Sequence, residues 1–178
     1  AFAIFAAMIA AAGLPLYIHA PKFYVDEYGV SLAALGTVLF GLRLLDFVQD
    51  PVLGKLATVW RNKRGLSVCV AALTMAAAML GLFSVAPATT PLVWFAVMLT
   101  LVFSSFSYLT ICFYAEGVSS AQRIEGQGHI KLARWRETGA LLGICAASVA
   151  PIAIGGYGGF AFAIFAAMIA AAGLPLYI

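Results

Sequence analysis

The chain has 178 residues, of which 64% are hydrophobic and only 10% are charged, and its formal net charge is +3. Soluble domains carry about 45–50% apolar and about 25% charged residues, and a chain of this length has too little interior to hide the apolar excess. The composition excludes an ordinary soluble domain, and the short basic clusters exclude nucleic acid as a partner, so we predict an all-α, polytopic membrane protein in contact with the lipid bilayer.

A helix needs about 20 mainly apolar residues to cross a bilayer. Residues 19–31 (HAPKFYVDEYGVS) mix charges with aromatic side chains and are interpreted as an interfacial loop, and a second polar loop is expected at about 116–128. The apolar segments predict a single bundle of about six transmembrane helices over residues 1–178, at roughly 1–19, 31–57, 66–86, 91–115, 131–154 and 160–178.

The first and last segments of the chain are identical. Residues 1–18 and 161–178 both read AFAIFAAMIAAAGLPLYI. Repeats inside transporters diverge to weak similarity, so we interpret the identity as an end-duplication, with a recent tandem duplication as the alternative. The chain starts with Ala and stops inside an apolar run, so we expect both ends to be cut and the chain to be a fragment.

The basic residues predict the orientation in the membrane. Four of them lie at 55–64 and four more at 123–136, whereas the alternate loops carry only Lys22. Because cytoplasmic loops are enriched in Lys and Arg, loops 58–65 and 116–131 are expected in the cytoplasm and the first span starts inside. The expected location is the bacterial inner (plasma) membrane.

The second span carries three charges, which is unusual for a membrane helix. Arg43, Asp46 and Asp50 are spaced i, i+3 and i+7, which places them on one helical face. Each would cost about 2.5–3.5 kcal/mol at the bilayer centre, so they must face a protein interior or a water-filled cavity. The arginine neutralises one carboxylate, which leaves the other, with Gln49 nearby, as a predicted sodium or proton site. The alternative is a closed salt bridge that only fixes helix packing.

A family resemblance rests mainly on RLLDFVQDPVLG (residues 43–54), which is followed by the basic loop WRNKRG. This pattern resembles the second span of the glycoside–pentoside–hexuronide:cation symporters, the major facilitator family that includes melibiose permease. Residues 14–31 and ARWRETGALLG (133–143) resemble its first and fifth spans. The resemblance implies two six-helix halves, each a 3+3 inverted repeat, with the solute and cation between them. This chain would be the amino-terminal half, and its partner would be a missing carboxy-terminal half.

The resemblance also implies roles for individual residues. Sugar-transporting members carry acids where this sequence has Ala10 and Thr110, so the likeness is greater for the cation site than for the sugar site. The cation ligands would be Asp46, Asp50 and Gln49, completed by a hydroxyl from Ser107 or Thr110, and the residues near the substrate would be Arg43 and either Arg134 or Arg136.

A further charged group flanks the loop after the fourth span. Glu116, Arg134, Arg136 and Glu137 predict either an ion-pair gate or a solvated interfacial cluster. The leading hypothesis for the chain is sodium- or proton-coupled symport of a small polar solute such as a sugar, by alternating access. The alternative is a non-transporting membrane scaffold or channel with a structural Arg–Asp bridge. The sequence contains no HExxH motif, no paired acid and nucleophile and no His/Cys cluster, so neither an enzyme nor a cofactor beyond the coupling cation is expected.

Overall fold

The computed structural model describes residues 2–14, 19–122 and 128–154 of the chain. Within these ranges every regular element is a helix, which confirms the predicted all-α class. The elements in chain order are α1 (Phe2–Leu14), α2 (Ala20–Tyr28), α3 (Leu32–Val59), the short 3-10 turn η2 (Arg61–Lys63), α4 (Arg64–Phe83), α5 (Pro91–Gln122) and α6 (Gly128–Ile154).

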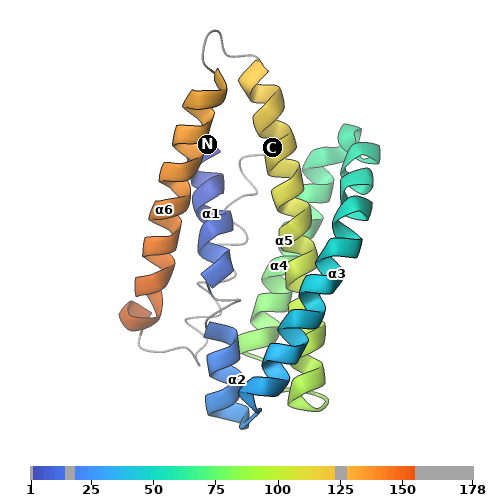
Figure 1. The fold of residues 1–178 in the computed structure, drawn as a ribbon, viewed down its shortest axis with the longest axis vertical. Helices are drawn as coiled ribbons and strands as arrows, with labels where there is room; N and C mark the ends of the chain where they lie inside the picture. The colour runs from blue at the N-terminus through green and yellow to red at the C-terminus, as the bar shows by residue number, and fades with distance from the viewer. Residues whose placement is uncertain (1, 15–18, 123–127, 155–178) are drawn as a thin grey trace.

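The long helix α5 runs through the middle of the molecule (Figure 1). It packs against α4 and α3 on one side and against α6 on the other, and α6 in turn packs along α1. The short helix α2 lies across one end of the bundle, where it contacts α3, α4 and α5. The turn between α3 and α4, the last turn of α5 and the first turn of α6 all lie at the opposite end.

Three of the described helices are long and apolar enough to cross a membrane, namely Leu32–Val59, Arg61–Phe83 and Pro91–Ser119. They coincide with the second, third and fourth predicted spans. The fifth predicted span corresponds to α6. Of the first, the structure describes the 13-residue helix α1, and the sixth lies outside the described residues.

The interpretation of residues 19–31 as a loop is wrong, because most of them form α2. Pro21 lies in its first turn, where a missing N–H costs nothing, and Gly29 ends it with a positive φ of 63°. Phe23 and Tyr24 are buried against Phe83 and other aromatic rings, and the Tyr24 hydroxyl donates a hydrogen bond to the Leu82 carbonyl at 3.2 Å. Aromatic packing therefore folds a segment that is too polar to span a membrane.

The predicted loop at about 116–128 is also shorter than expected. Helix α5 continues to Gln122, and α6 begins at Gly128. Glu116 and the residues that follow it are polar, but they extend the helix beyond its apolar part rather than ending it.

The main apolar core lies between α4 and α5. Met75, Met79 and Leu82 of α4 meet Phe95 and Leu99 of α5, and all five are almost fully buried. The small residues of α4 let the two helices approach closely. Gly81 is an example, because a Cβ there would lie 2.9 Å from the sulfur of Met98.

Helices α1 and α6 touch through their backbones. A Cβ added to Gly139 would collide with the carbonyl of Ala3, and one added to Gly143 would collide with the carbonyl of Ala7. Residue numbers rise together along both helices, so α1 and α6 run parallel. The segment GALLG thus forms a GxxxG contact, the small-residue motif that brings membrane helices together.

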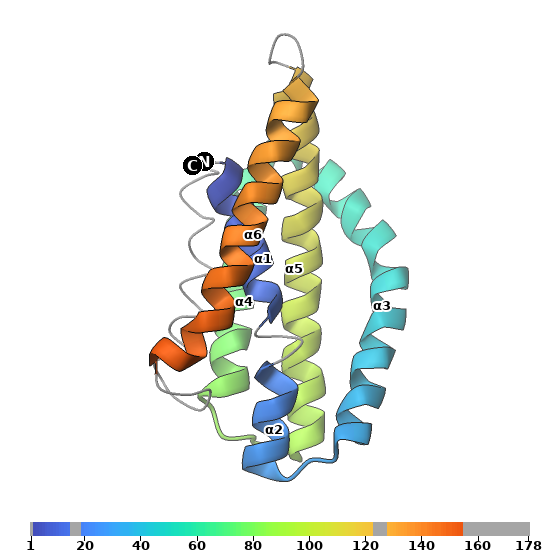
Figure 2. The same ribbon diagram turned by 60° about the vertical axis from the view of Figure 1, so that its left-hand side comes forward.

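Helix α3 is exposed along most of its length. The Ser31 side chain caps it by accepting a hydrogen bond from the Ala34 N–H at 3.2 Å, and Pro51 lies inside it. Its buried residues are Leu35, Leu42 and Ala57. Figure 2 shows α3 bowed relative to the straighter α5, as expected for a helix in which Pro removes one backbone hydrogen bond.

Candidate functional site

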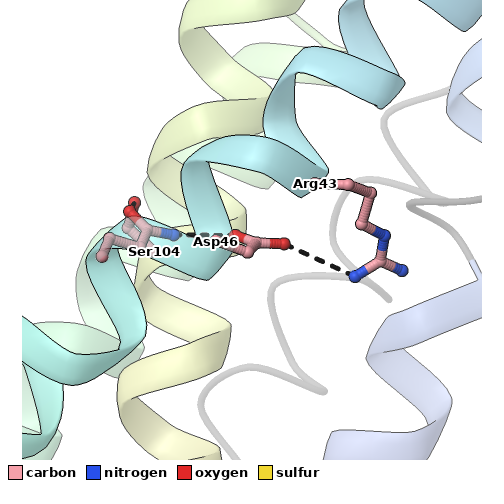
Figure 3. Close-up of polar contacts among 4 residues, drawn as sticks. Arg43, Asp46 and Ser104 are labelled. Carbon is pink, nitrogen blue, oxygen red and sulfur yellow. Dashed lines mark hydrogen bonds and ion pairs between the residues drawn. The ribbon is translucent and has the colours of Figure 1, made fainter.

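The three charges of the second predicted span lie in the middle of α3, and two of them are joined. Arg43 Nη1 lies 3.4 Å from Asp46 Oδ2, so the pair forms a long ion pair across one helical turn (Figure 3). The two ends differ in exposure: the Asp46 side chain is 14% exposed and the Arg43 side chain 60%. The guanidinium also stands 5.7 Å from the ring centroid of Phe103 on α5, within the range of a cation–π contact.

The other oxygen of Asp46 connects α3 to α5. Gln49 Nε2 donates to Asp46 Oδ1 at 2.8 Å, and the Ser104 hydroxyl donates to Gln49 Oε1 at 2.9 Å. The result is a polar chain from Arg43 through Asp46 and Gln49 to Ser104. Gln49 thus lies beside the carboxylate that Arg43 already pairs with, Asp46, and its amide oxygen faces Ser104 rather than a free carboxylate.

Ser104 is the residue that sequence reasoning missed. The predicted hydroxyls were Ser107 and Thr110, and neither joins this chain of hydrogen bonds. Ser107 is half-buried on α5, and the Thr110 hydroxyl is buried with no hydrogen-bond partner among the described residues. Ser104, Ser107 and Thr110 follow each other by three residues along α5, so all three were candidates from their spacing. The sequence does not determine which of these turns faces Gln49.

Asp50 follows Asp46 by one helical turn and is exposed. Within the described residues it forms no ion pair. Arg43 therefore balances one of the two carboxylates, and this face of α3 keeps one uncompensated negative charge.

The predicted gating residues fall into two separate groups. Glu116 pairs with Arg64 at the start of α4, with Nη1 and Oε2 3.1 Å apart, rather than with an arginine of α6. Arg136 binds Glu137 at 2.6 Å and stands 5.5 Å from the ring centroid of Tyr114. Arg134 is exposed on α6. Both views place α6 and α3 on opposite sides of α5, so neither arginine approaches Asp46 (Figures 1 and 2).

The groups around Asp46 are of the chemical kind that binds cations or protons in membrane proteins. A carboxylate offers about four acceptor positions, and the two hydrogen bonds to Asp46 leave some of them open. Asp50 offers a second carboxylate on the next turn. Oxygen ligands of this kind suit a hard cation, and a carboxylate in a membrane helix is a typical proton carrier.

Comparison with protein families decides the class. The family described as MFS/sugar transport protein matches residues 1–178. The chain belongs to this family. No curated protein and no solved structure matches it.

The chain is therefore an integral membrane protein of a family that transports sugar-type solutes. The family indicates transport rather than catalysis. The three apolar helices of sufficient length agree with that assignment. The narrower resemblance to the glycoside–pentoside–hexuronide symporters stays a prediction, as do the individual site residues.

Proposed function

We propose that the protein is a cation-coupled symporter that moves a small polar solute, of the sugar type, by alternating access. The observation that carries the proposal is the charged face of α3. It holds Arg43, Asp46 and Asp50 in a helix long and apolar enough to span a membrane, with Asp50 outside any ion pair among the described residues. An ionisable group in such a helix is costly, so it is expected to serve an ion or proton pathway.

The proposed coupling site consists of Asp46 and Asp50, with Gln49 beside them, and the Gln49 amide would turn its oxygen from Ser104 towards the site to become a ligand. Sodium would take carboxylate and amide oxygens as ligands, and a proton would bind one carboxylate. Because Gln49 is held by Ser104, a change at the cation site would reach α5 directly. Ser107 and Thr110 lie further along α5 and would join only after a rotation of that helix.

The proposed transport cycle needs a second wall. Arg43, Asp50 and several apolar residues of α3 are exposed, among them Phe47, which is 84% exposed. We propose that a second six-helix half faces this side and encloses the solute, as in transporters built from two repeats. Arg134 and Arg136 lie on α6, on the other side of α5, so in this conformation they do not face the proposed solute cavity, and a gating role would require α6 to move.

We propose the bacterial inner membrane as the location, with the end that carries η2 in the cytoplasm. The basic segments 61–64 and 131–136 lie at the same end of the bundle, which is what the positive-inside rule requires of two cytoplasmic loops (Figure 1). The parallel course of α1 and α6 agrees with it, because both helices would then start on the cytoplasmic side.

One observation favours a second candidate, a structural role for the Arg43–Asp46 pair. Both oxygens of Asp46 are engaged, by Arg43 and by Gln49, so the carboxylate links two turns of α3 and, through Ser104, two helices. On this reading Asp46 fixes packing, and Asp50 has no function in transport.

The proposed function is tested by solute accumulation in vesicles that contain the protein together with the proposed second six-helix half. A panel of labelled sugars is offered under an imposed sodium gradient, an imposed proton gradient or neither. We expect accumulation of at least one sugar above its external concentration under one gradient, and its loss when an ionophore collapses that gradient. Sugar equilibration that no gradient changes would overturn the symport mechanism.

A further inference from the structure

A hollow borders the polar chain of α3 at its far end, at Ser104 of α5. It has a volume of about 290 Å³ and opens between α3, α4 and α5. Along α3 it extends from Leu53 to Trp60, which corresponds to about 10 Å at the rise of an α-helix. Its wall is formed by Leu53, Leu56, Trp60, Ser67, Val70, Ala71, Thr74, Leu101, Ser104, Ser105 and Tyr108.

The wall of this cavity is apolar in practice, although several of its residues carry hydroxyl groups. Ser67 donates to the carbonyl of Arg64 at 2.9 Å and Thr74 to that of Val70 at 2.8 Å, while Ser104 donates to Gln49. These three donors are therefore used within the protein, and the Tyr108 hydroxyl, also in the wall, is buried without a hydrogen-bond partner among the described residues. A sugar would find few hydrogen-bond partners here, whereas a hydrocarbon chain would lose none.

The same cavity ends at a basic turn. Trp60 forms part of its wall and is followed directly by η2, in which Arg61 and Lys63 are both exposed. Among the described residues neither forms an ion pair, whereas the neighbouring Arg64 is taken up by Glu116. The positive charges of Arg61 and Lys63 thus follow the end of an apolar cavity between three helices that are long and apolar enough to span a membrane.

We propose that this cavity binds an anionic phospholipid, with one acyl chain between α3, α4 and α5 and the phosphate at Arg61 and Lys63. The charge of the turn complements the phosphate, and the apolar wall complements the chain. Half-exposed apolar side chains at the rim, such as Leu56 and Val70, would be covered by the lipid. Basic pockets between membrane helices are a known kind of site for acidic headgroups. The inference does not depend on cation coupling.

The test measures lipid binding to the purified full-length protein in detergent by native mass spectrometry. Phosphatidylglycerol is titrated against phosphatidylcholine with the same acyl chains. We expect phosphatidylglycerol to bind about thirtyfold more tightly, since each of the two basic residues near the headgroup contributes about fivefold. Equal binding of the two lipids would overturn the proposal.

Variants separate the two parts of the site. Arg61→Gln with Lys63→Gln is expected to remove the preference for phosphatidylglycerol, and Lys131→Gln, an exposed basic residue of α6 at the same end, is the matched control. Val70→Phe fills the cavity from its half-exposed rim and is expected to weaken binding of both lipids, with folding checked by circular dichroism. A preference that survives the double variant, or binding that survives Val70→Phe, would contradict the proposal.

Two further outcomes identify other occupants. Displacement of phosphatidylglycerol by millimolar inorganic phosphate would show a site for the free anion and would overturn the lipid assignment. Dimers that form only when lipid is absent, and that Val70→Phe abolishes, would show that a second copy covers the cavity and would also overturn it. Neither outcome affects sugar accumulation under a cation gradient, so failure here is distinguishable from failure of the proposed symport.

Discussion

The two sides of α5 are built on different principles. On one side α6 and α1 meet backbone to backbone through Gly139 and Gly143, with no room for a methyl group. On the other side α3 is mostly exposed, is interrupted by Pro51 and is joined to α5 by side chains that include a polar chain and border a cavity. Of the three described helices that are long and apolar enough to span a membrane, only α3 has charged residues in its middle. One side therefore consists of a closely paired α1 and α6 that contact α5 sparsely, and the other of a charged helix that contacts α5 more extensively through side chains.

The largest loss of stability is expected from a change that separates α1 from α6. Gly143→Ala places a methyl group on the carbonyl of Ala7, so the helices must separate, and we expect a loss of about 1–3 kcal/mol or more in the free energy of unfolding. Thermal unfolding of the purified protein measures it. Gly36→Ala on α3 is the control, because a Cβ there meets nothing within 4 Å, and it should leave stability unchanged or slightly raised. Equal losses at both positions would contradict the difference between the two sides.

A smaller effect is expected on the α3 side. Ser104→Ala removes the hydrogen bond to Gln49, and hydrogen bonds between membrane helices contribute about 0.6 kcal/mol on average. We expect a small loss of stability but a change in the cation concentration that half-saturates transport, because Gln49 then holds Asp46 less firmly. Ser107→Ala is the matched control on the next turn. If the control changes the cation dependence and Ser104→Ala does not, Ser104 is not part of the site.

The smallest effect concerns the ion pair between α4 and α5. Arg64 and Glu116 are partly exposed, so solvent screening reduces their coupling to about 0.5 kcal/mol. A double-mutant cycle with Arg64→Gln and Glu116→Gln, followed by thermal unfolding, should show that coupling energy. A cycle of Glu116→Gln with Arg136→Gln should show none. The reverse result would restore the ion-pair gate between α5 and α6 that the sequence had suggested.

Hydropathy located the long helices well. The expected span at 31–57 is α3, and the one at 66–86 is α4, each shifted by only a few residues. Hydropathy failed at residues 19–31, because it records the charges of α2 but not the aromatic contacts of Phe23 and Tyr24 that bury one of its faces. Its helical signals, Pro21 near the start and Gly29 at the end, were present in the sequence.

The candidate site could be predicted only along one helix. The spacing of Arg43, Asp46 and Gln49 fixes their shared face, and the structure joins all three. Contacts between helices depend on rotation and depth, which spacing within a helix does not determine. For this reason Ser104 rather than Ser107 or Thr110 meets Gln49, and Arg64 rather than an arginine of α6 meets Glu116. The spacing of the two glycines in GALLG is present in the sequence, but the sequence does not identify α1 as the helix that they contact.

The central claim is that Asp46 and Asp50 bind the coupling cation. The most direct test replaces each by Asn and measures both sugar accumulation under an imposed sodium or proton gradient and the amount of folded protein in the membrane. Glu27→Gln is the control, an exposed acid of α2 at the end of the bundle opposite η2. We predict that Asp46→Asn and Asp50→Asn each abolish coupled accumulation while the folded amount stays close to that of the control. Coupled accumulation that survives in either variant would contradict the claim, and a loss of folded protein confined to Asp46→Asn would favour the structural bridge.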